Sequence, residues 1–289
     1  MREKLFKNWK LVATGILIFA NLLVWQMVWL ETPSGKLTIS FLDVGQGDAI
    51  FIESPTGAQM LIDGGPSGRL GAPLAKVMPW YDRSIDVVIA THPDADHIGG
   101  LPLVFERYKV ENFIEPGVKG DTGVARELEF REKAEGSIKI LARRGQTIDL
   151  GGGAKLQILF PDKDVTTWET NDASIVAKLI YGSTTVMLTG DASEKIEKYL
   201  IAIDSAVLDS DILKLGHHGS KTSTSEEFLK AVSPNLAIIS AGLNNRYGHP
   251  HGEVTDRLNA LGIKTLRTED FSHQKTITLV SDGFKFVEE

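Results

Sequence analysis

The stretch THPDADHIGG, residues 91–100, contains two histidines and two aspartates within six positions. It follows the apolar run IDVVIA, residues 85–90, which is typical of a buried strand, and it ends at a Gly pair where a helix can begin. A loop in this place directs successive side chains over the edge of a sheet. We therefore expect it to hold one or two metal ions through His92, Asp94, Asp96 and His97.

A second part of the chain repeats the arrangement around this motif. A hairpin strand ends at Asp63, and 29 residues later an apolar strand ends at His92; the same order recurs at Asp191 and His217, 26 residues apart. A helical stretch separates the strands in both halves, as in α/β layers. Because sites in such folds lie at the carboxyl ends of strands, we expect these residues to share one edge. The predicted fold class is α/β, a four-layer αββα sandwich.

The remaining segments fit this architecture. Residues 37–63 have the pattern of strands joined by antiparallel hairpins. Further helices are expected over 70–81, 98–108 and 253–261, and further strands over 236–240 and 276–280. Residues 111–154, with a charged helical stretch at 124–134 and a Gly151-Gly152-Gly153 turn, are expected to form a connector between the halves.

The composition restricts how a metal can be held. The chain of 289 residues has no cysteine, which excludes a thiolate zinc site, a cysteine nucleophile and a disulfide framework. Six of the seven histidines fall in three short motifs, at positions 92 and 97, 217 and 218, and 249 and 251. Imidazole and carboxylate groups are therefore the expected ligands.

Together with Asp63, Asp191 and the sequence HHGS at 217–220, the stretch 92–97 resembles the motifs of the metallo-β-lactamase superfamily. More narrowly, FLDVGQGD at 41–48, THPDADHIGG at 91–100 and NRYGHPH at 245–251 resemble the extracellular metallo-β-lactamase-like domain of the ComEC proteins of DNA-uptake competence. The resemblance covers residues 37–281. It implies the αββα fold and a metal-dependent hydrolase, with a nuclease role.

The implied ligand set differs from the usual superfamily pattern. Asp94 stands where a histidine is usual, and no histidine occurs between His97 and His217. The segment 171–174, Asn-Asp-Ala-Ser, lies where the missing histidine is expected and supplies either an oxygen ligand or only a turn. The better-formed site then comprises Asp96, His97, Asp191 and His217, and a second ion would use His92, Asp94 and Asp191. Oxygen-rich coordination shifts the expectation from zinc towards manganese, so one or two Mn²⁺ or Zn²⁺ ions are expected.

Other residues are expected to act around the ions. Asp63 is expected to accept a hydrogen bond and orient the 92–97 loop without touching metal. Because neighbouring strand residues point to opposite faces, only one of His217 and His218 is expected on the metal. We assign His217 to the metal, and His218 donates to a substrate oxygen. The residues assigned to catalysis are Asp96, His218 and His249.

Two polar loops are candidates for substrate binding. In the first, Ser220 and Lys221 either contact a phosphate group or form a glycine turn with an ordinary surface lysine. In the second, Arg246 offers bidentate phosphate recognition, and Tyr247 offers a face on which a base can stack. Substrate contacts are therefore predicted from Ser220, Lys221, Asn245, Arg246 and Tyr247, while His249 is a proton donor or a ligand.

The N-terminus has the pattern of a membrane anchor. Residues 11–30 are 20 consecutive uncharged residues, about the length that a helix needs to cross a bilayer. Residues 1–10 carry four basic side chains, which predicts a cytoplasmic segment by the positive-inside rule. Residues 31–36 have a linker composition, and residues 37–289 are the predicted hydrolase domain. The prediction is a single-pass protein of the cell membrane with an extracytoplasmic domain; a cleaved signal peptide is the alternative.

The charge distribution bears on the substrate. The formal net charge is −7, and because the first 30 residues are basic, residues 31–289 carry −10. That field repels a polyanion, so nucleic acid has to be bound through a local patch or through metal. The predicted function is a membrane-anchored phosphodiesterase or nuclease acting on DNA or another phosphodiester. The alternatives are a hydrolase of a cell-wall or lipid phosphoester, a β-lactamase, and a non-catalytic metal-binding module.

Overall fold

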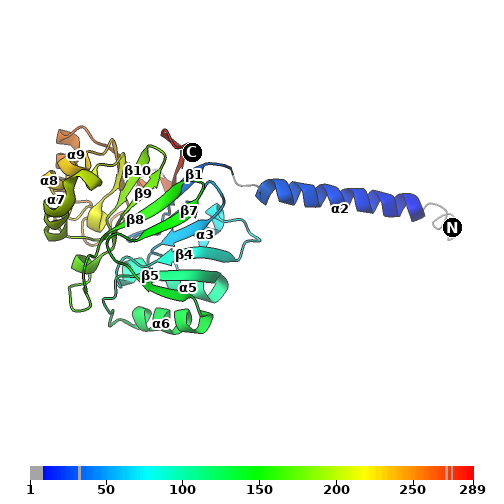
Figure 1. Cartoon of the computed structure of the whole chain (residues 1–289), viewed down its shortest axis with the longest axis horizontal. Coiled ribbons are helices and arrows are strands. Elements are labelled where there is room, and N and C mark those ends of the chain that lie inside the picture. The colour runs from blue at the N-terminus through cyan, green and yellow to red at the C-terminus, as the bar shows by residue number, and fades with distance from the viewer. Residues whose placement is uncertain (1–8, 32–33, 271–272, 275) are drawn as a thin grey trace. The chain divides into compact units, whose positions relative to one another are not determined.

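The computed structural model describes residues 9–31, 34–270, 273–274 and 276–289 (Figure 1). The chain consists of two compact units, divided between Ser34 and Gly35. The first unit contains the helix α2 (Trp9–Glu31), and the second contains the sheets.

Helix α2 covers the predicted anchor, residues 11–30. At 1.5 Å per residue its 23 residues extend about 34 Å, enough to cross the roughly 30 Å hydrocarbon core of a bilayer. Within the part of the chain that the structure describes, it is the one helix long and apolar enough for this, over Trp9–Gln26. The helix thus supports membrane association by its length and composition, while its orientation stays a prediction.

Two sheets form the centre of the second unit. The strands of the eight-stranded sheet lie in the order β17 (Phe286–Glu288), β16 (Ile277–Ser281), β1 (Leu37–Phe41), β2 (Ile50–Glu53), β3 (Gln59–Ile62), β4 (Ser84–Ile89), β5 (Lys109–Glu115) and β6 (Ile138–Leu141). Those of the seven-stranded sheet lie in the order β13 (Lys264–Arg267), β12 (Leu236–Ile239), β11 (Ile212–Lys214), β10 (Thr184–Leu188), β9 (Val176–Tyr181), β8 (Ala154–Phe160) and β7 (Thr147–Gly151). A separate pair is formed by β14 (Glu269–Asp270) and β15 (His273–Gln274).

Helices cover the outer face of each sheet (Figure 1). Those on the eight-stranded sheet are α3 (Gly71–Val77), α4 (Ala95–Ile98), α5 (Leu101–Arg107) and α6 (Gly123–Glu135). Those on the seven-stranded sheet are α7 (Glu194–Leu208), α8 (Glu226–Val232) and α9 (Gly252–Ala260). A third apolar core fills the space between the sheets. The predicted four-layer αββα sandwich is therefore confirmed.

The continuous apolar runs of the central strands follow from this layering. Ile52 and Met60 lie in the core between the sheets, whereas the adjacent Phe51 and Leu61 lie in the core beneath the helices. Successive residues of a strand point to opposite faces of its sheet. A strand with a layer on both sides therefore needs an apolar side chain at every position.

The predicted repeat of strand, helix and strand is confirmed in both sheets. β3 pairs parallel with β4 across α3, and β10 pairs parallel with β11 across α7. Asp63 directly follows β3, and His92 lies three residues beyond β4. Asp191 and His217 likewise lie three residues beyond β10 and β11. Equivalent strand ends therefore deliver these four residues to the carboxyl edge of the two sheets.

The prediction that residues 111–154 are a connector is wrong. Lys109–Glu115 form β5 inside the eight-stranded sheet, where Val110 and Phe113 are buried. Ile138–Leu141 form β6 beside it, and β7 already belongs to the other sheet. The predicted helix is present as α6, and the glycine turn joins β7 to β8. The charged residues in KVENFIE interrupt the apolar run of β5, which hides the strand in the sequence.

Phe41 offers a test of the core between the sheets, because its side chain is 1% exposed there. Phe41→Ala should lower the free energy of unfolding by about 3–5 kcal/mol through lost burial and the cavity left behind. The control is Phe130→Ala on α6, where the ring is 66% exposed and a change below about 0.5 kcal/mol is expected. Denaturant unfolding followed by circular dichroism measures both, and equal losses would contradict the assigned layers.

Candidate metal centre

Loops at the shared sheet edge bring acidic and imidazole side chains together. The loop after β4 leads into α4, whose first turn carries Asp96 and whose third residue is His97. Asp191 lies in the turn between β10 and α7. The one-turn helix η2 (Gly216–Gly219), which follows β11, carries His217 and His218. Each of these elements is fixed by a buried strand, so the side chains converge without long flexible segments.

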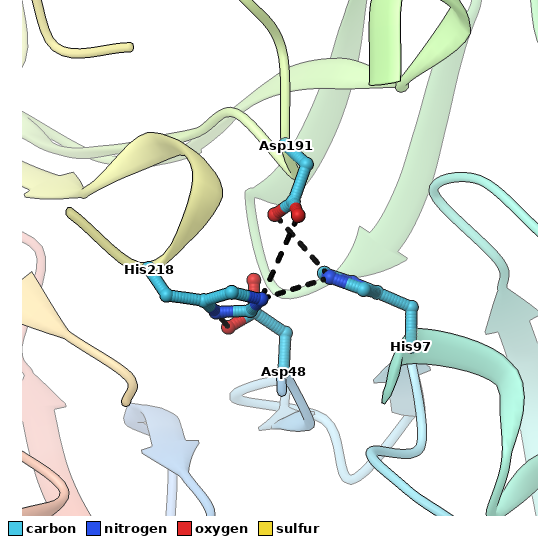
Figure 2. Close-up of side chains that lie close together, drawn as sticks. All are labelled: Asp48, His97, Asp191 and His218. Atoms are coloured by element: carbon cyan, nitrogen blue, oxygen red, sulfur yellow. Dashed lines mark hydrogen bonds and ion pairs between the residues drawn. The ribbon is translucent and has the colours of Figure 1, made fainter. Parts of the chain in front are cut away.

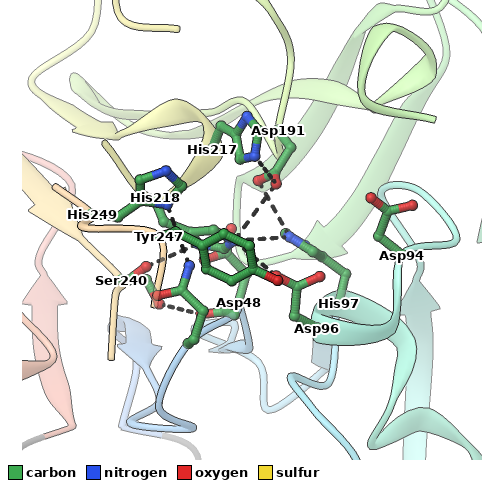
Figure 3. Close-up of polar contacts among 12 residues, drawn as sticks. Asp48, Asp94, Asp96, His97, Asp191, His217, His218, Ser240, Tyr247 and His249 are labelled. Carbon is green, nitrogen blue, oxygen red and sulfur yellow. Dashed lines mark hydrogen bonds and ion pairs between the residues drawn. The ribbon is translucent and has the colours of Figure 1, made fainter. Parts of the chain in front are cut away.

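Three side chains, Asp96, His97 and Asp191, present ligand atoms to His218 (Figure 3), and Figure 2 shows His97, Asp191 and His218 without Asp96. The Nε2 atom of His218 lies 3.5 Å from Asp96 Oδ2 and 3.6 Å from Asp191 Oδ2. The Nε2 atom of His97 lies 3.3 Å from His218 Nε2 and 3.3 Å from Asp191 Oδ1. Ligand atoms that surround a tetrahedral ion at about 2.0–2.1 Å lie about 3.3–3.4 Å from one another. The spacing in this cluster therefore fits a divalent ion.

His92 and Asp94 extend the cluster on one side. The Nε2 atom of His92 lies 3.7 Å from Asp94 Oδ2 and 3.9 Å from Asp191 Oδ2. His92 is fully buried, and its Nε2 finds no hydrogen-bond partner among the described residues. A buried polar atom without a partner is costly, and a bound cation would supply that partner. The nitrogen and oxygen donors of this edge thus fit a divalent metal site.

Asp63 lies behind His97 and fixes its ring. Its Oδ2 accepts hydrogen bonds from His97 Nδ1 at 2.8 Å and from Thr91 Oγ1 at 2.7 Å, and its Oδ1 accepts one from the Thr91 backbone N–H at 2.8 Å. A hydrogen bond at Nδ1 leaves Nε2 of His97 facing the cluster. These contacts support the orienting role predicted for Asp63.

The prediction that His217 and His218 point to opposite faces of a strand is wrong, because the chain does not continue as a strand through them. His217 and His218 have left-handed φ angles of 47° and 57° within η2. Alternation of faces no longer applies, and both rings approach Asp191 Oδ2, at 3.7 Å from His217 and 3.6 Å from His218. The side chain of His218 is 1% exposed and that of His217 is 27% exposed. This geometry favours His218 over His217 as a ligand.

Asp48 is a member of the site to which the sequence analysis assigned no role. With His97, Asp191 and His218 it forms a buried group whose potential ligand atoms all lie within 4.8 Å of one another (Figure 2). Its loop follows β1, which runs parallel to β3 because both pair antiparallel with β2. Topology would thus have placed this carboxylate at the same edge once the hairpins were predicted.

Charges inside the cluster shift pKa values in opposite directions. Burial lowers the pKa of His92 to about 4, and the charge of His97 adds to this effect. Burial also lowers the pKa of His218, but the carboxylates of Asp191 and Asp48 outweigh it and raise the pKa to about 9. Burial raises the pKa of Asp191, yet His97 and His218 hold it well below its usual range. Asp191 is therefore ionised at neutral pH, and cation binding would release protons from the imidazoles around it.

The segment 171–174 forms a turn. Its first three residues are the one-turn helix η1 (Asn171–Ala173). The Asp172 carboxylate accepts hydrogen bonds from Ser193 Oγ and from Lys195 Nζ, and Ser174 Oγ accepts one from the Asp191 backbone N–H. These contacts support a turn at Asp172 and Ser174, whereas Asn171 Oδ1 is buried without a hydrogen-bond partner among the described residues. Of the two predictions for this segment, an oxygen ligand or only a turn, both therefore stay open.

Asn245 organises the loop that carries the other candidate substrate residues. Its Nδ2 donates to the carbonyl oxygens of Gly242 and His249, and its Oδ1 accepts from the backbone N–H groups of Tyr247 and His249. Hydrogen bonds within the loop thus use both the NH₂ group and the oxygen of the Asn245 side chain. The geometry therefore gives no support to a direct substrate contact by Asn245.

Tyr247 lies beside Asp96 (Figure 3), and both it and its neighbour Arg246 are exposed. Arg246 Nη2 donates to the Tyr247 hydroxyl at 2.6 Å, and its Cζ lies 4.8 Å from the centre of that ring. The hydrogen bond to Tyr247 and, to a smaller extent, the negative charge of Asp96 raise the pKa of Arg246. Tyr247 is 48% exposed and stacks with His249 at 5.6 Å between ring centres. A cation and an aromatic face are therefore available beside the ligands.

The other candidate phosphate loop is divided between the interior and the surface. Ser220 is buried, and its Oγ lies 3.0 Å from Thr222 Oγ1. The side chain of Lys221 is exposed, while its backbone N–H donates to His251 Nδ1 at 3.1 Å. Lys221 is thus better placed than Ser220 to meet a substrate.

Residues 42–242, which include most of these ligands, match the metallo-beta-lactamase superfamily. The chain belongs to this superfamily. Among solved structures, Zn²⁺-bound PqqB from Methylobacterium extorquens has a TM-score of 0.54 at 10% identity, covering 84% of this chain and 99% of that chain. At this identity the likeness shows the fold alone.

Two curated relatives are similar to most of the chain. It is 31% identical over 260 residues to ComE operon protein 3 of Bacillus subtilis (strain 168), and 31% identical over 242 residues to Competence protein ComA of Neisseria gonorrhoeae. In both cases the match covers 82% of this chain and 32% of the relative, so the chain spans about a third of their length. The predicted resemblance to ComEC-type competence proteins is confirmed, and the chain contains a hydrolase-type metal-binding fold related to them.

Asp63→Asn tests the orienting contact behind His97. Asparagine tolerates the left-handed φ of 58° at this position, but its amide cannot replace all three bonds accepted by the carboxylate. We expect Zn²⁺ affinity to fall about 10–100-fold in isothermal titration calorimetry. The matched control is Asp86→Asn in β4, whose carboxylate accepts a bond from the Gln59 N–H outside the cluster. Unchanged affinity in the Asp63 variant would refute the orienting role.

Proposed function

We propose that this chain is a membrane-anchored, metal-dependent phosphodiesterase that acts outside the cytoplasm on DNA or another phosphodiester. The observation that carries the proposal is the convergence of Asp96, His97 and Asp191 on His218, whose Nε2 lies 3.3–3.6 Å from a ligand atom of each. One of the similar proteins is named a competence protein, which supports a DNA-related substrate.

The proposed cofactor is one or two Mn²⁺ or Zn²⁺ ions. Mixed imidazole and carboxylate ligands suit both metals. The residues that would hold them are His92, Asp94, Asp96, His97, Asp191 and, from η2, His218 or His217. When bound, such an ion lowers the pKa of a water molecule and withdraws charge from a phosphoryl oxygen.

The protein side chains around this centre define how a substrate approaches. His92, His97 and His218 are buried, so the accessible side is that of Asp94 and Asp96, whose side chains are 39% and 33% exposed. On that side the Arg246 guanidinium pairs with phosphate oxygens. The exposed face of Tyr247 stacks with a base.

His249 and Lys221 complete the proposed substrate side. The His249 ring lies 5.5 Å from the His217 ring and 6.3 Å from the His218 ring, measured between centres. It is the proposed carrier of a proton from the attacking water to the leaving oxygen, and it starts neutral because burial and the charges of His217 and His218 lower its pKa to about 4. Lys221 adds a positive charge in a domain whose overall charge is negative, and the negative charge favours brief contact over tight binding of a polyanion.

The membrane placement rests on α2 and on the charge that precedes it. Four of the first ten residues are basic, and the positive-inside rule then directs the second unit away from the cytoplasm. An anchored enzyme in that position meets phosphodiesters outside the cell.

A substrate panel tests the reaction class. Bis-p-nitrophenyl phosphate and single-stranded DNA should be hydrolysed with Mn²⁺ or Zn²⁺, and nitrocefin should not. Asp191→Asn should lower kcat/KM about 100-fold or more, because it removes the carboxylate that faces four imidazoles. The matched control is Asp211→Asn, whose carboxylate accepts bonds from Thr185 outside the cluster.

Each other outcome of the panel supports a different function. Activity on nitrocefin alone would favour a β-lactamase over a phosphodiesterase. Activity on bis-p-nitrophenyl phosphate without activity on DNA would favour a cell-wall or lipid phosphoester. Unchanged metal content by mass spectrometry in the Asp96→Ala, Asp191→Ala double variant would show that these residues do not hold the ion.

Tyr247 tests base recognition separately from chemistry. Tyr247→Ala should raise KM for single-stranded DNA about 5-fold or more, since stacking contributes about 1–3 kcal/mol per base. Tyr247→Phe keeps the ring and is the control, with KM close to the wild-type value. Hydrolysis of bis-p-nitrophenyl phosphate should be similar in all three proteins. A raised KM in the Phe variant as well would point to the hydroxyl rather than to stacking.

A further inference from the structure

We infer that Asp48 and Lys214 form a buried ion pair that positions His218, so that its Nε2 faces the metal centre. The inference rests on the proposed metal centre and adds two positioning residues to it. They come from different sheets, because Asp48 lies in the loop after β1 and Lys214 is the last residue of β11.

The pair lies in the interior beneath the cluster. The side chain of Lys214 is 1% exposed and that of Asp48 is 3% exposed. Lys214 Nζ donates to Asp48 Oδ2 and, at 2.9 Å, to the carbonyl oxygen of Leu215. A lone charge at this depth is strongly unfavourable. Each member of the pair therefore depends on the other.

The second oxygen of Asp48 faces the back of His218 (Figure 2). Asp48 Oδ1 lies 3.3 Å from His218 Nδ1, and the same nitrogen lies 2.9 Å from the Ser240 carbonyl oxygen. Because a carbonyl oxygen can only accept, Nδ1 carries the hydrogen and donates it to Ser240, while the negative charge of Asp48 Oδ1 lies beside the same N–H. The other ring nitrogen, Nε2, is then the one available to the ligand cluster.

The loop of Asp48 is held from several sides, which keeps the carboxylate in place. Its backbone N–H donates to the carbonyl oxygen of Asp96 at 3.3 Å, and its carbonyl oxygen accepts from the Gly65 N–H at 2.7 Å. Ser240 Oγ donates to the Gly47 carbonyl oxygen at 2.7 Å. The loop thereby contacts residues at the carboxyl edge of both sheets, including Asp96 from the eight-stranded sheet and Ser240 after β12 of the seven-stranded sheet.

These contacts favour positioning by Asp48 over direct ligation. Lys214 occupies its Oδ2, and its Oδ1 lies at the Nδ1 side of His218, whereas Nε2 faces Asp96 and Asp191. His97 has the same arrangement, with Asp63 at its Nδ1. A carboxylate behind an imidazole ligand is a common way to fix its ring and tautomer. Two buried carboxylates would then set the direction of two ligands.

The test compares the full chain in detergent with Asp48→Asn, Lys214→Met and the double variant. In Asp48→Asn the amide oxygen turns towards Lys214, so the NH₂ group faces the His218 Nδ1 donor and the attraction between the carboxylate and the ring is lost. The double variant removes both charges and so avoids a lone buried charge if a single variant fails to fold. The matched control is Lys178→Met, whose ammonium donates to the Val207 and Asp209 carbonyls near the end of α7.

Two measurements report on positioning. Isothermal titration calorimetry with Zn²⁺ should show affinity about 10–100-fold lower in each single variant. The double variant should lose about the same factor, because both substitutions act through one contact. In the Zn²⁺-loaded protein labelled with ¹⁵N-histidine, the His218 signature of a protonated Nδ1 and a metal-bound Nε2 should be present in wild type and Lys178→Met, and altered in the other variants.

Three results would overturn the inference. The first is wild-type Zn²⁺ affinity and an unchanged His218 signature in both single variants. The second is losses that multiply in the double variant, and the third is a lower coordination number by X-ray absorption in Asp48→Asn, which would make Asp48 a ligand. Failure of the wild-type protein to bind Zn²⁺ would overturn the metal centre as well, and is thus distinguishable from these results.

Discussion

The carboxylate of Asp191 is the group on which the rest of the site depends. It is 4% exposed, and the imidazoles of His92, His97, His217 and His218 approach it within 3.3–3.9 Å. A negative charge at this depth is tolerated only beside opposite charge, which His97 and His218 supply because, despite their burial, Asp191 raises the pKa of both. His92 and His97 come from one sheet, and Asp191 comes from the other with His217 and His218. The core that packs the two sheets against each other therefore stabilises the fold and also brings these side chains to Asp191.

Much of the architecture could be predicted from the sequence, because its signals are local. Apolar strands followed by His and Asp recur at similar intervals in the sequence. This pattern predicts both sheets and five residues around Asp191, namely His92, Asp94, Asp96, His97 and His217. The distinction between His217 and His218 could not be predicted, because it depends on a left-handed turn that strand periodicity does not reveal. Asp48 was missed because its partner, Lys214, lies 166 residues away on the other sheet. β5 was missed because charged residues interrupt its apolar pattern.

The loops at the site are stabilised in the same way, by hydrogen bonds with polar side chains. Each uses a buried or half-buried polar side chain to satisfy its own backbone or a neighbouring ring: Asp63 binds Thr91 and His97, and Asn245 closes the loop of Tyr247. Such contacts fix the conformations of the side chains at this edge. The buried polar side chains at this edge therefore preorganise the site, whereas the apolar layers stabilise the fold.

The left-handed turn at His217 and His218 has a consequence for engineering. A non-glycine residue in this backbone region costs about 1–3 kcal/mol, a cost that glycine largely avoids. A search guided by melting temperature alone would therefore favour replacements that discard both imidazoles. Replacing these residues with glycine would therefore stabilise the fold but remove both imidazoles from the site. A thermostable variant that keeps them needs stabilising substitutions elsewhere in the chain.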